Sequence, residues 1–168
     1  SELNLSFNHI DDNVAPQMKA FLSKNQTITK LDVSGNSLTS RFAAAIAGPL
    51  LSNSILTDLN LSRNPIGGKG FSILGPSIAV NKYMKYLNVS SCQIDSKGFN
   101  DFCLDIMKNV ELISLNASQN SLLDEGVSTL VEVIKVHPTL RELDLELTEL
   151  TDIGGIPLFE AIPFCKTL

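Results

Sequence analysis

A spacing of 28 residues recurs through the whole chain and constrains its fold more than any other feature. The chain has 168 residues, which is six times 28. The same residue type opens each unit: Leu3, Leu31, Leu59, Leu87, Leu115 and Leu143. A column that is mostly asparagine follows five positions later: Asn8, Asn36, Asn64, Cys92, Asn120 and Thr148. Because no insertion breaks this period, the sequence predicts an array of six equal units.

Each unit has two halves with different hydrophobic periodicity. Apolar and polar residues alternate around the lead leucine, which predicts a short strand. In the second half, apolar residues stand four apart, as with Met18 and Leu22, which predicts a helix of about ten to twelve residues. The combined pattern, LxxLxLxx(N/C/T)x(L/I) followed by GxxxLxxxLxxNxxL, resembles the ribonuclease-inhibitor-like subfamily of leucine-rich repeats. The resemblance covers all 168 residues, although uniform 28-residue units and only three cysteines depart from ribonuclease inhibitor itself.

This resemblance implies an α/β fold: a right-handed, curved leucine-rich-repeat solenoid of six repeats, with a parallel sheet on the concave side and helices on the convex side. Parallel strands lie about 4.8 Å apart and packed helices about 8–10 Å apart, so the stack must bend. Strands are expected at Leu3–Leu5, Leu31–Val33, Leu59–Leu61, Leu87–Val89, Leu115–Ala117 and Leu143–Leu145. Residues 1–168 form one array, and because neither end carries a polar capping sequence, we expect a segment of a longer array.

The two asparagine columns are interpreted as structural. The first is predicted to satisfy backbone groups left unpaired in the turn after each strand, with Cys92 and Thr148 as small polar substitutes. The second column lies where each helix ends: Asn25, Asn53, Asn81, Asn109 and then His137. Its members are predicted to stop the helix in the left-handed conformation. Pro49 and Pro76 are expected to shorten or deform the second and third helices.

No motif in the chain carries catalytic or metal-binding chemistry. Gly67-Gly68-Lys69-Gly70 lacks the spacing of a phosphate-binding loop, and no zinc pattern appears. We therefore predict no enzyme activity, no metal and no cofactor. A net charge of −5 without a basic cluster argues against nucleic acid, and no apolar run is long enough for membrane insertion. Three cysteines do not make a disulfide framework, and a reducing, cytoplasmic location is expected.

The outward positions of the strands provide the candidate binding residues. They are Asp32, Asp58, Arg63, Tyr86, Asn88, Asn116, Asp144 and Glu146. Arg63 and Tyr86 are the anchor-type side chains, and we expect them within about 5–10 Å of each other on adjacent strands. The last repeat carries six acidic and two basic residues, either as a rim that attracts a basic partner or as a solubilising edge. The wall of Asn and Ser between these positions is equally compatible with an inert surface and a binding one.

These features favour a non-enzymatic protein–protein interaction or scaffold module that presents its concave surface to a protein partner. The acidic rim favours a partner with a basic surface. Two alternatives stay open. One is a regulator of a GTPase resembling the Ran GTPase-activating protein, although the acidic tail of such proteins is absent from this sequence. The other is a structural spacer in a cytoskeletal or ciliary assembly.

Overall fold

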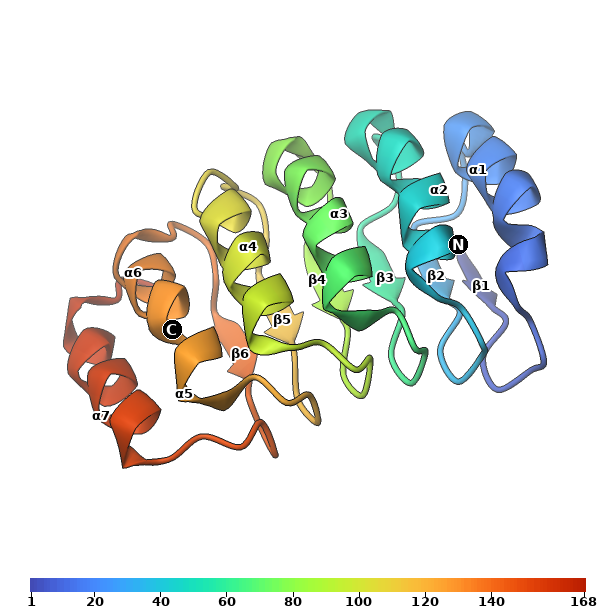
Figure 1. Cartoon of the computed structure of the whole chain (residues 1–168). Coiled ribbons are helices and arrows are strands. Elements are labelled where there is room, and N and C mark those ends of the chain that lie inside the picture. The colour runs from blue at the N-terminus through green and yellow to red at the C-terminus, as the bar shows by residue number, and fades with distance from the viewer.

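The computed structural model describes residues 1–168 as one curved array of two layers (Figure 1). Six three-residue strands form one parallel sheet in chain order: β1 (Glu2–Asn4), β2 (Lys30–Asp32), β3 (Asp58–Asn60), β4 (Tyr86–Asn88), β5 (Ser114–Asn116) and β6 (Glu142–Asp144). Equivalent residues pair throughout, so that Leu31 lies opposite Leu59. The predicted parallel sheet of six repeats is confirmed. Each strand begins and ends one residue earlier than expected. Main-chain hydrogen bonds between repeats continue beyond the end of each strand, since Leu5 N donates to Asp32 O.

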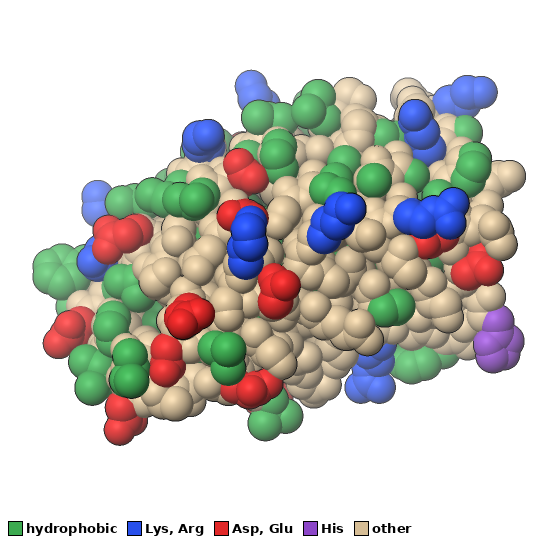
Figure 2. All heavy atoms as spheres, in the orientation of Figure 1, with side chains coloured by type: hydrophobic (Ala, Val, Ile, Leu, Met, Phe, Trp, Pro, Cys, Tyr) green, Lys and Arg blue, Asp and Glu red, His purple; other side chains and the backbone are tan.

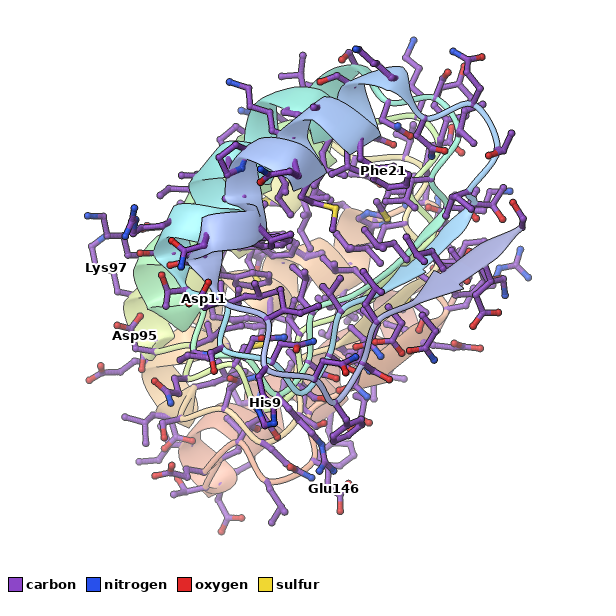
Figure 3. All side chains as sticks on the ribbon, turned by 90° about the vertical axis from the view of Figure 1, so that its right-hand side faces the viewer. His9, Asp11, Phe21, Asp95, Lys97 and Glu146 are labelled. Atoms are coloured by element: carbon purple, nitrogen blue, oxygen red, sulfur yellow. The ribbon has the colours of Figure 1, made fainter.

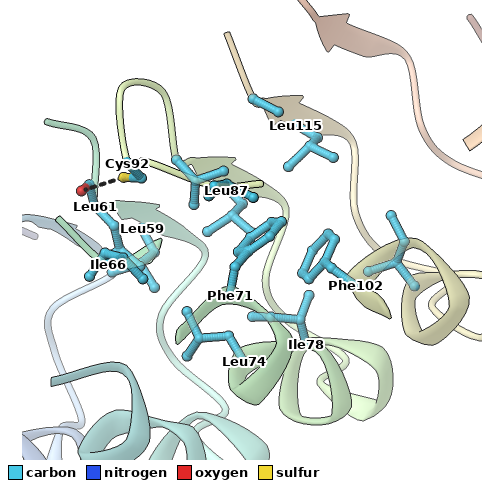
Figure 4. Close-up of a cluster of buried hydrophobic side chains, with 14 of the residues drawn as sticks. Leu59, Leu61, Ile66, Phe71, Leu74, Ile78, Leu87, Cys92, Phe102 and Leu115 are labelled. Carbon is cyan, nitrogen blue, oxygen red and sulfur yellow. Dashed lines mark hydrogen bonds between the residues drawn. The ribbon is translucent and has the colours of Figure 1, made fainter. Parts of the chain in front are cut away.

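All helices cover the same face of the sheet (Figure 1). They are α1 (Ala15–Lys24), α2 (Ser40–Ser52), α3 (Gly67–Val80), α4 (Ser96–Ile106), α5 (Leu123–Gly126), α6 (Ser128–Val136) and α7 (Asp152–Ala161), with short 3-10 turns at Asp12–Val14 and Ile162–Phe164. One cluster of 37 buried hydrophobic side chains fills the space between the layers. At its centre Phe71 of α3 stacks on Phe102 of α4, with ring centroids 4.0 Å apart (Figure 4).

The expectation that Pro49 and Pro76 shorten their helices is wrong. Helix α2 has 13 residues and α3 has 14, and both run through their proline. Each proline lies in the last turns, and the helical bonding resumes after it, since Asn53 N donates to Pro49 O and Asn81 N donates to Ser77 O. A proline that removes one bond near a helix end, inside a packed layer, therefore leaves the helix intact.

The second asparagine column forms a ladder of hydrogen bonds that the sequence reasoning did not anticipate. The side-chain oxygen of Asn81 accepts from the backbone N–H groups of Tyr83 and Met84, at 2.8 and 2.7 Å. Its amide nitrogen donates back to Leu50 O and Asn53 O of the preceding repeat. Asn81 has φ −67° and ψ 131°, so the predicted left-handed conformation is wrong. The amide turns the chain while the backbone stays extended.

His137 occupies this column in the fifth repeat and reproduces only half of the pattern. Its Nδ1 accepts from Leu140 N at 3.1 Å and from Thr139 N at 3.4 Å, which leaves the proton of the neutral ring on Nε2. Nε2 is buried and has no hydrogen-bond partner. Burial lowers the pKa of His137, because a charged ring would lose its hydration there.

The helices α3 and α4 approach each other to backbone contact at two glycines. A Cβ on Gly98 would lie 2.3 Å from Gly68 Cα and 2.5 Å from Gly68 O. Helix backbone cannot move aside as a flexible side chain can, so this position excludes every larger residue. The close approach holds two neighbouring helices of the convex layer together at their N-terminal ends.

Both ends of the array leave parts of the core uncovered. Leu3 and Leu5 in the first repeat and Leu143 and Leu145 in the last are only partly buried, whereas the equivalent residues of the inner repeats are buried. The expectation that residues 1–168 are a segment of a longer array stays a prediction.

Replacing Gly98 with alanine is expected to lower the free energy of unfolding by about 3 kcal/mol, because the new methyl group collides with the backbone of α3. The matched control is Gly48→Ala in α2, where a Cβ meets nothing within 4 Å. That substitution should raise stability by roughly 0.5–1 kcal/mol, the helix preference for alanine. Urea unfolding followed by circular dichroism measures both. Equal effects of the two substitutions would contradict the close contact.

A second prediction concerns pH. The unfolded chain carries a histidine with a pKa of about 6.5, above that of folded His137, so the unfolded state binds more protons as the pH falls. Stability should therefore decrease below about pH 6.5, with a slope of up to ~1.4 kcal/mol per pH unit. His137→Asn should remove this component of the pH dependence. His9→Asn, at an exposed position, should not. Parallel stability curves for the wild type and His137→Asn would refute this role.

Candidate partner-binding face

The first asparagine column joins each repeat to the one before it. The amide nitrogen of Asn64 donates to Leu61 O and Ser62 O in its own repeat, at 2.9 and 3.2 Å, and to Val33 O of the preceding repeat at 3.0 Å. Its oxygen accepts from Leu38 N, also of the preceding repeat, at 3.0 Å. The equivalent bonds are made by Asn36 and Asn120. Asn8, in the first repeat, bonds only to Leu5 O and Ser6 O.

Cys92 and Thr148 replace asparagine as donors but not as acceptors. Cys92 Sγ donates to Leu61 O of the preceding repeat at 3.2 Å (Figure 4), and Thr148 Oγ1 donates to Leu145 O at 2.8 Å. Burial raises the pKa of the Cys92 thiol to about 11, so the sulfur keeps the proton that it donates. Neither side chain reaches the backbone N–H that asparagine would bind in the preceding repeat.

The missing acceptor changes the start of the preceding helix. Gly67 and Leu123 adopt left-handed backbone, with φ +70° and +56°, and their N–H groups donate to Cys92 O and Thr148 O. Helices α3 and α5 consequently begin without a side-chain cap. The other repeats have an extended residue at this position, whose side chain caps the helix or the 3-10 turn that precedes it: Asp11, Thr39, Asp95 and Thr151.

A third polar column lies on the concave face itself. The side-chain oxygen of Asn88 accepts from Ser90 N, two residues further along, at 3.0 Å. The same bond is made by Asn4, Asp32, Asn60, Asn116 and Asp144. Neighbouring strands are also joined, since Asn60 donates to Asp32 and Asn116 donates to Asp144, each at 3.0 Å. Part of the polarity that the sequence assigns to binding is therefore used inside the sheet.

Five of the eight predicted binding residues meet in one groove, of about 330 Å³, on the concave face. They are Asp32, Asp58, Tyr86, Asn88 and Asn116, and the lining also includes Glu2, Lys30, Asn60 and Ser114. Tyr86 is the only aromatic residue in the lining, and it is 42% exposed. Beside it, Lys30 and Asp58 form an ion pair with an Nζ–Oδ1 distance of 3.4 Å.

On strand β4, two side-chain groups in this groove make no hydrogen bond within the chain. These are the hydroxyl of Tyr86 and the side-chain nitrogen of Asn88, whereas the equivalent nitrogens of Asn60 and Asn116 donate to aspartates. The two residues lie on the same strand, β4, at the centre of the sheet. An aromatic ring with a free hydroxyl next to a free amide donor is a suitable anchor for a protein partner.

The structure does not bring Arg63 and Tyr86 into one hollow, as the sequence had led us to expect. Tyr86 pairs in register with Asp58 and lines the groove, whereas Arg63 lies five residues after Asp58, beyond the end of β3. Arg63 is in the left-handed turn after β3, where it lines a separate hollow with Ser91, Gln93 and Gln119. Its guanidinium carbon lies 5.8 Å from the centroid of the Phe7 ring. Arg63 and Tyr86 occupy different positions in their repeats, and the in-register pairing of β3 with β4 therefore does not place them side by side.

Asp144 and Glu146 also lie outside the groove. Asp144 ends β6 and receives the bond from Asn116, while Glu146 is exposed. In Figure 3, Glu146 lies with His9 on the side where the turns after the strands gather, far from Phe21 near the other end of the helix layer. The acidic rim and the groove are therefore separate features of the concave side.

The structure gathers no side chains into a metal-binding group. No group of three or more His, Cys, Asp or Glu residues is placed to hold a metal ion, and all three cysteines are free. The thiols of Cys92 and Cys103 are buried, and burial raises the pKa of both, which makes each a poor nucleophile. None of the helices combines the length and the apolar character needed to cross a membrane.

Comparison with protein families gives matches along most of the chain. A family model described as leucine-rich repeat matches residues 1–13, 24–47, 52–72, 80–99 and 136–159, together more than half of the chain. No curated protein sequence matches.

Several solved structures have the same fold. The actin-binding site 2 of leiomodin-1 is 16% identical, with a TM-score of 0.62 over 97% of this chain and 79% of that one. The C-terminal domain of tropomodulin from Caenorhabditis elegans is 12% identical, with a TM-score of 0.66 over 89% and 92%. An internalin from Listeria monocytogenes is 22% identical, with a TM-score of 0.55, and this chain spans 98% of its own length but only 38% of the internalin. At these identities the similarity establishes the fold.

The left-handed turn before α5 leads to a testable prediction. Leu123 is a leucine at φ +56°, in the position that Gly67 fills two repeats earlier. Leu123→Gly should therefore raise the free energy of unfolding by about 1 kcal/mol, through release of backbone strain. The control is Leu104→Gly in α4, where a similarly exposed leucine has helical backbone and glycine should cost about 1 kcal/mol. Destabilisation by both substitutions in chemical unfolding would rule out the strain.

Proposed function

Because the chain belongs to the leucine-rich repeat family, we propose that it is a non-enzymatic protein-binding module that holds its partner in the concave groove around Tyr86. The family and its structural neighbours support a protein-interaction module. The observation that carries the choice of surface is the free hydroxyl of Tyr86 beside the free amide nitrogen of Asn88, between strands whose equivalent asparagines donate to aspartates.

The charge of the groove indicates the chemistry of the partner. Glu2, Asp32 and Asp58 provide three carboxylates in the lining, against the single ammonium group of Lys30. Asp58 is already paired with Lys30, and Asp32 accepts from Asn60, but Glu2 has no basic partner. A partner segment with a basic side chain and hydrogen-bond acceptors complements this surface. The acidic residues of the last repeat extend the attraction along the concave side, including Asp144 and Glu146.

Two other functions fit the same fold and belong to the proposal as alternatives. A regulator of a GTPase would increase the rate of GTP hydrolysis by its bound partner. A structural spacer in a cytoskeletal assembly would be packed by neighbours over its helices and would leave the groove empty. The similarity to a leiomodin-1 actin-binding site makes actin the first candidate to assay for such an assembly.

Site-specific cross-linking tests the groove directly. Replacing Tyr86 with the photoreactive amino acid benzoylphenylalanine places a probe of similar shape at the proposed anchor. The control places it at Leu104, which is 56% exposed but lies on helix α4, outside the groove. We expect a discrete protein adduct from position 86, identified by mass spectrometry, and none from position 104.

The partner recovered in this way allows an affinity measurement. Truncating a true anchor costs about 2 kcal/mol, so Tyr86→Ala should weaken binding by roughly 30-fold in calorimetric titration. Leu104→Ala should leave the affinity unchanged. Adducts from position 104 alone, or equal affinities for both variants, would move the interface away from the groove and favour the spacer. Faster hydrolysis by a captured GTPase would support the regulator.

A further inference from the structure

A distinct surface runs along the edge where the helices end and the chain returns to the sheet. We call it the basic edge, and it comprises residues 23–29, 51–57, 79–85, 107–113, 135–141 and 163–168. It contains seven of the 13 Lys and Arg residues but only one of the 18 Asp and Glu residues: Lys24, Lys82, Lys85, Lys108, Lys135, Arg141 and Lys166, with Glu111. The edge therefore has a net charge of +6, whereas the rest of the chain has −11.

Most of these cations have no ionic partner. Only Lys135 forms an ion pair, with Glu132. Favourable interaction with helix dipoles explains basic residues in the last turn of a helix, such as Lys24 and Lys135. It does not explain Lys82, Lys85 and Arg141, which lie in the loops between helix and strand. The segregation of charge therefore requires another reason.

Large apolar side chains are exposed along the same edge. Between 37% and 57% of the surface of each residue is accessible to solvent, and the residues come from four successive repeats: Leu51, Val80, Tyr83, Met107, Val110 and Val136. Figure 2 shows Lys and Arg beside hydrophobic side chains along the upper edge of the molecule, with Asp and Glu gathered at the lower left. Exposed apolar groups interspersed with unpaired cations mark an interaction surface rather than a solvated rim.

We propose that the basic edge is a second docking surface, which binds an acidic, amphipathic segment of a protein partner. Successive helices pack about 8–10 Å apart, so apolar groups from four repeats form a narrow strip on the order of 30 Å long. That length fits a helix of about 20 residues. Carboxylates on such a segment pair with the free ammonium groups, while its apolar face covers the strip.

A narrow segment fits this edge better than a flat anionic membrane does. Glu111 follows Val110 within the edge, and Glu132 is paired with Lys135, so a planar bilayer would have to approach these carboxylates together with the cations. A narrow segment can place its own carboxylates against the ammonium groups alone. The basic edge is also separate from Tyr86 on the concave face, with the opposite charge preference, and its occupancy does not depend on the function proposed for the groove.

The test uses a synthetic 20-residue helical peptide with glutamate on one face and leucine on the other. The variant is Lys82→Glu with Lys108→Glu, two exposed and unpaired positions on the edge. The control is Lys19→Glu with Lys69→Glu, which has the same charge change at exposed positions off the edge. In calorimetric titration we expect the edge variant to bind the peptide at least about tenfold more weakly than wild type, with little change for the control or for Tyr86→Ala.

Several outcomes would overturn the proposal. These are the absence of measurable peptide binding to wild type, equal weakening by the control pair, and equal binding of a scrambled peptide with the same composition. Co-sedimentation with vesicles of phosphatidylcholine and phosphatidylserine, lost in the edge variant while peptide binding is absent, would assign the edge to a membrane instead. Loss of cross-linking from position 86 in the edge variant would show that the two surfaces are one interface.

Discussion

Hydrogen bonds made by buried asparagine side chains connect each repeat to the next, and the rest of the array depends on them. The strands are only three residues long, so the main chain alone contributes few bonds between repeats. The turns on either side would leave buried N–H and C=O groups unpaired, which is costly in a dry interior. Asn64 on one side and Asn81 on the other each bond to both their own repeat and the preceding one. Two parallel rows of amides thereby fix the spacing of the sheet and place the outward side chains in columns.

The groove around Tyr86 follows from this arrangement. Equivalent positions of successive repeats stand side by side, so that one column displays a continuous row of polar groups on the concave face. The oxygens of this column accept from the backbone, and Asn60 and Asn116 also donate to aspartates, whereas the side-chain nitrogen of Asn88 makes no bond. At Asn88 no aspartate is available on either side, since its neighbours are both asparagines. The polar groups that stay free for a partner are therefore determined by positions where one repeat differs from its neighbours, and not by the residues that all repeats share.

The sequence predicted the fold almost completely, because a constant period places every buried leucine and every helix without further information. It predicted which residues face the concave side, but not which of them come together. Arg63 and Tyr86 belong to different columns, and their separation depends on the length of the strand and on the turn after it. The sequence reasoning predicted left-handed backbone at Asn81, whereas the backbone there is extended. Asparagine at the end of a helix is found in both left-handed caps and extended turns, so its residue type alone does not distinguish them. The basic edge was not recognised, because its lysines are scattered along the chain and the spacing of repeats gathers them only in three dimensions.

The relation between Cys92 and Gly67 means that the repeats of this chain are not freely interchangeable. A repeat that carries cysteine or threonine in the first ladder requires a predecessor whose backbone can turn left-handed, as at Gly67 and Leu123. If the fourth repeat were copied behind the first, the N–H of Ile10 would lose the acceptor that Asn36 now provides. Recombination that shuffles units of this protein would therefore preserve its packing best when it moves the third and fourth repeats, or the fifth and sixth, as inseparable pairs. In these two pairs of repeats the unit that can be exchanged without loss of hydrogen bonds is 56 residues long, twice the 28-residue period of the sequence.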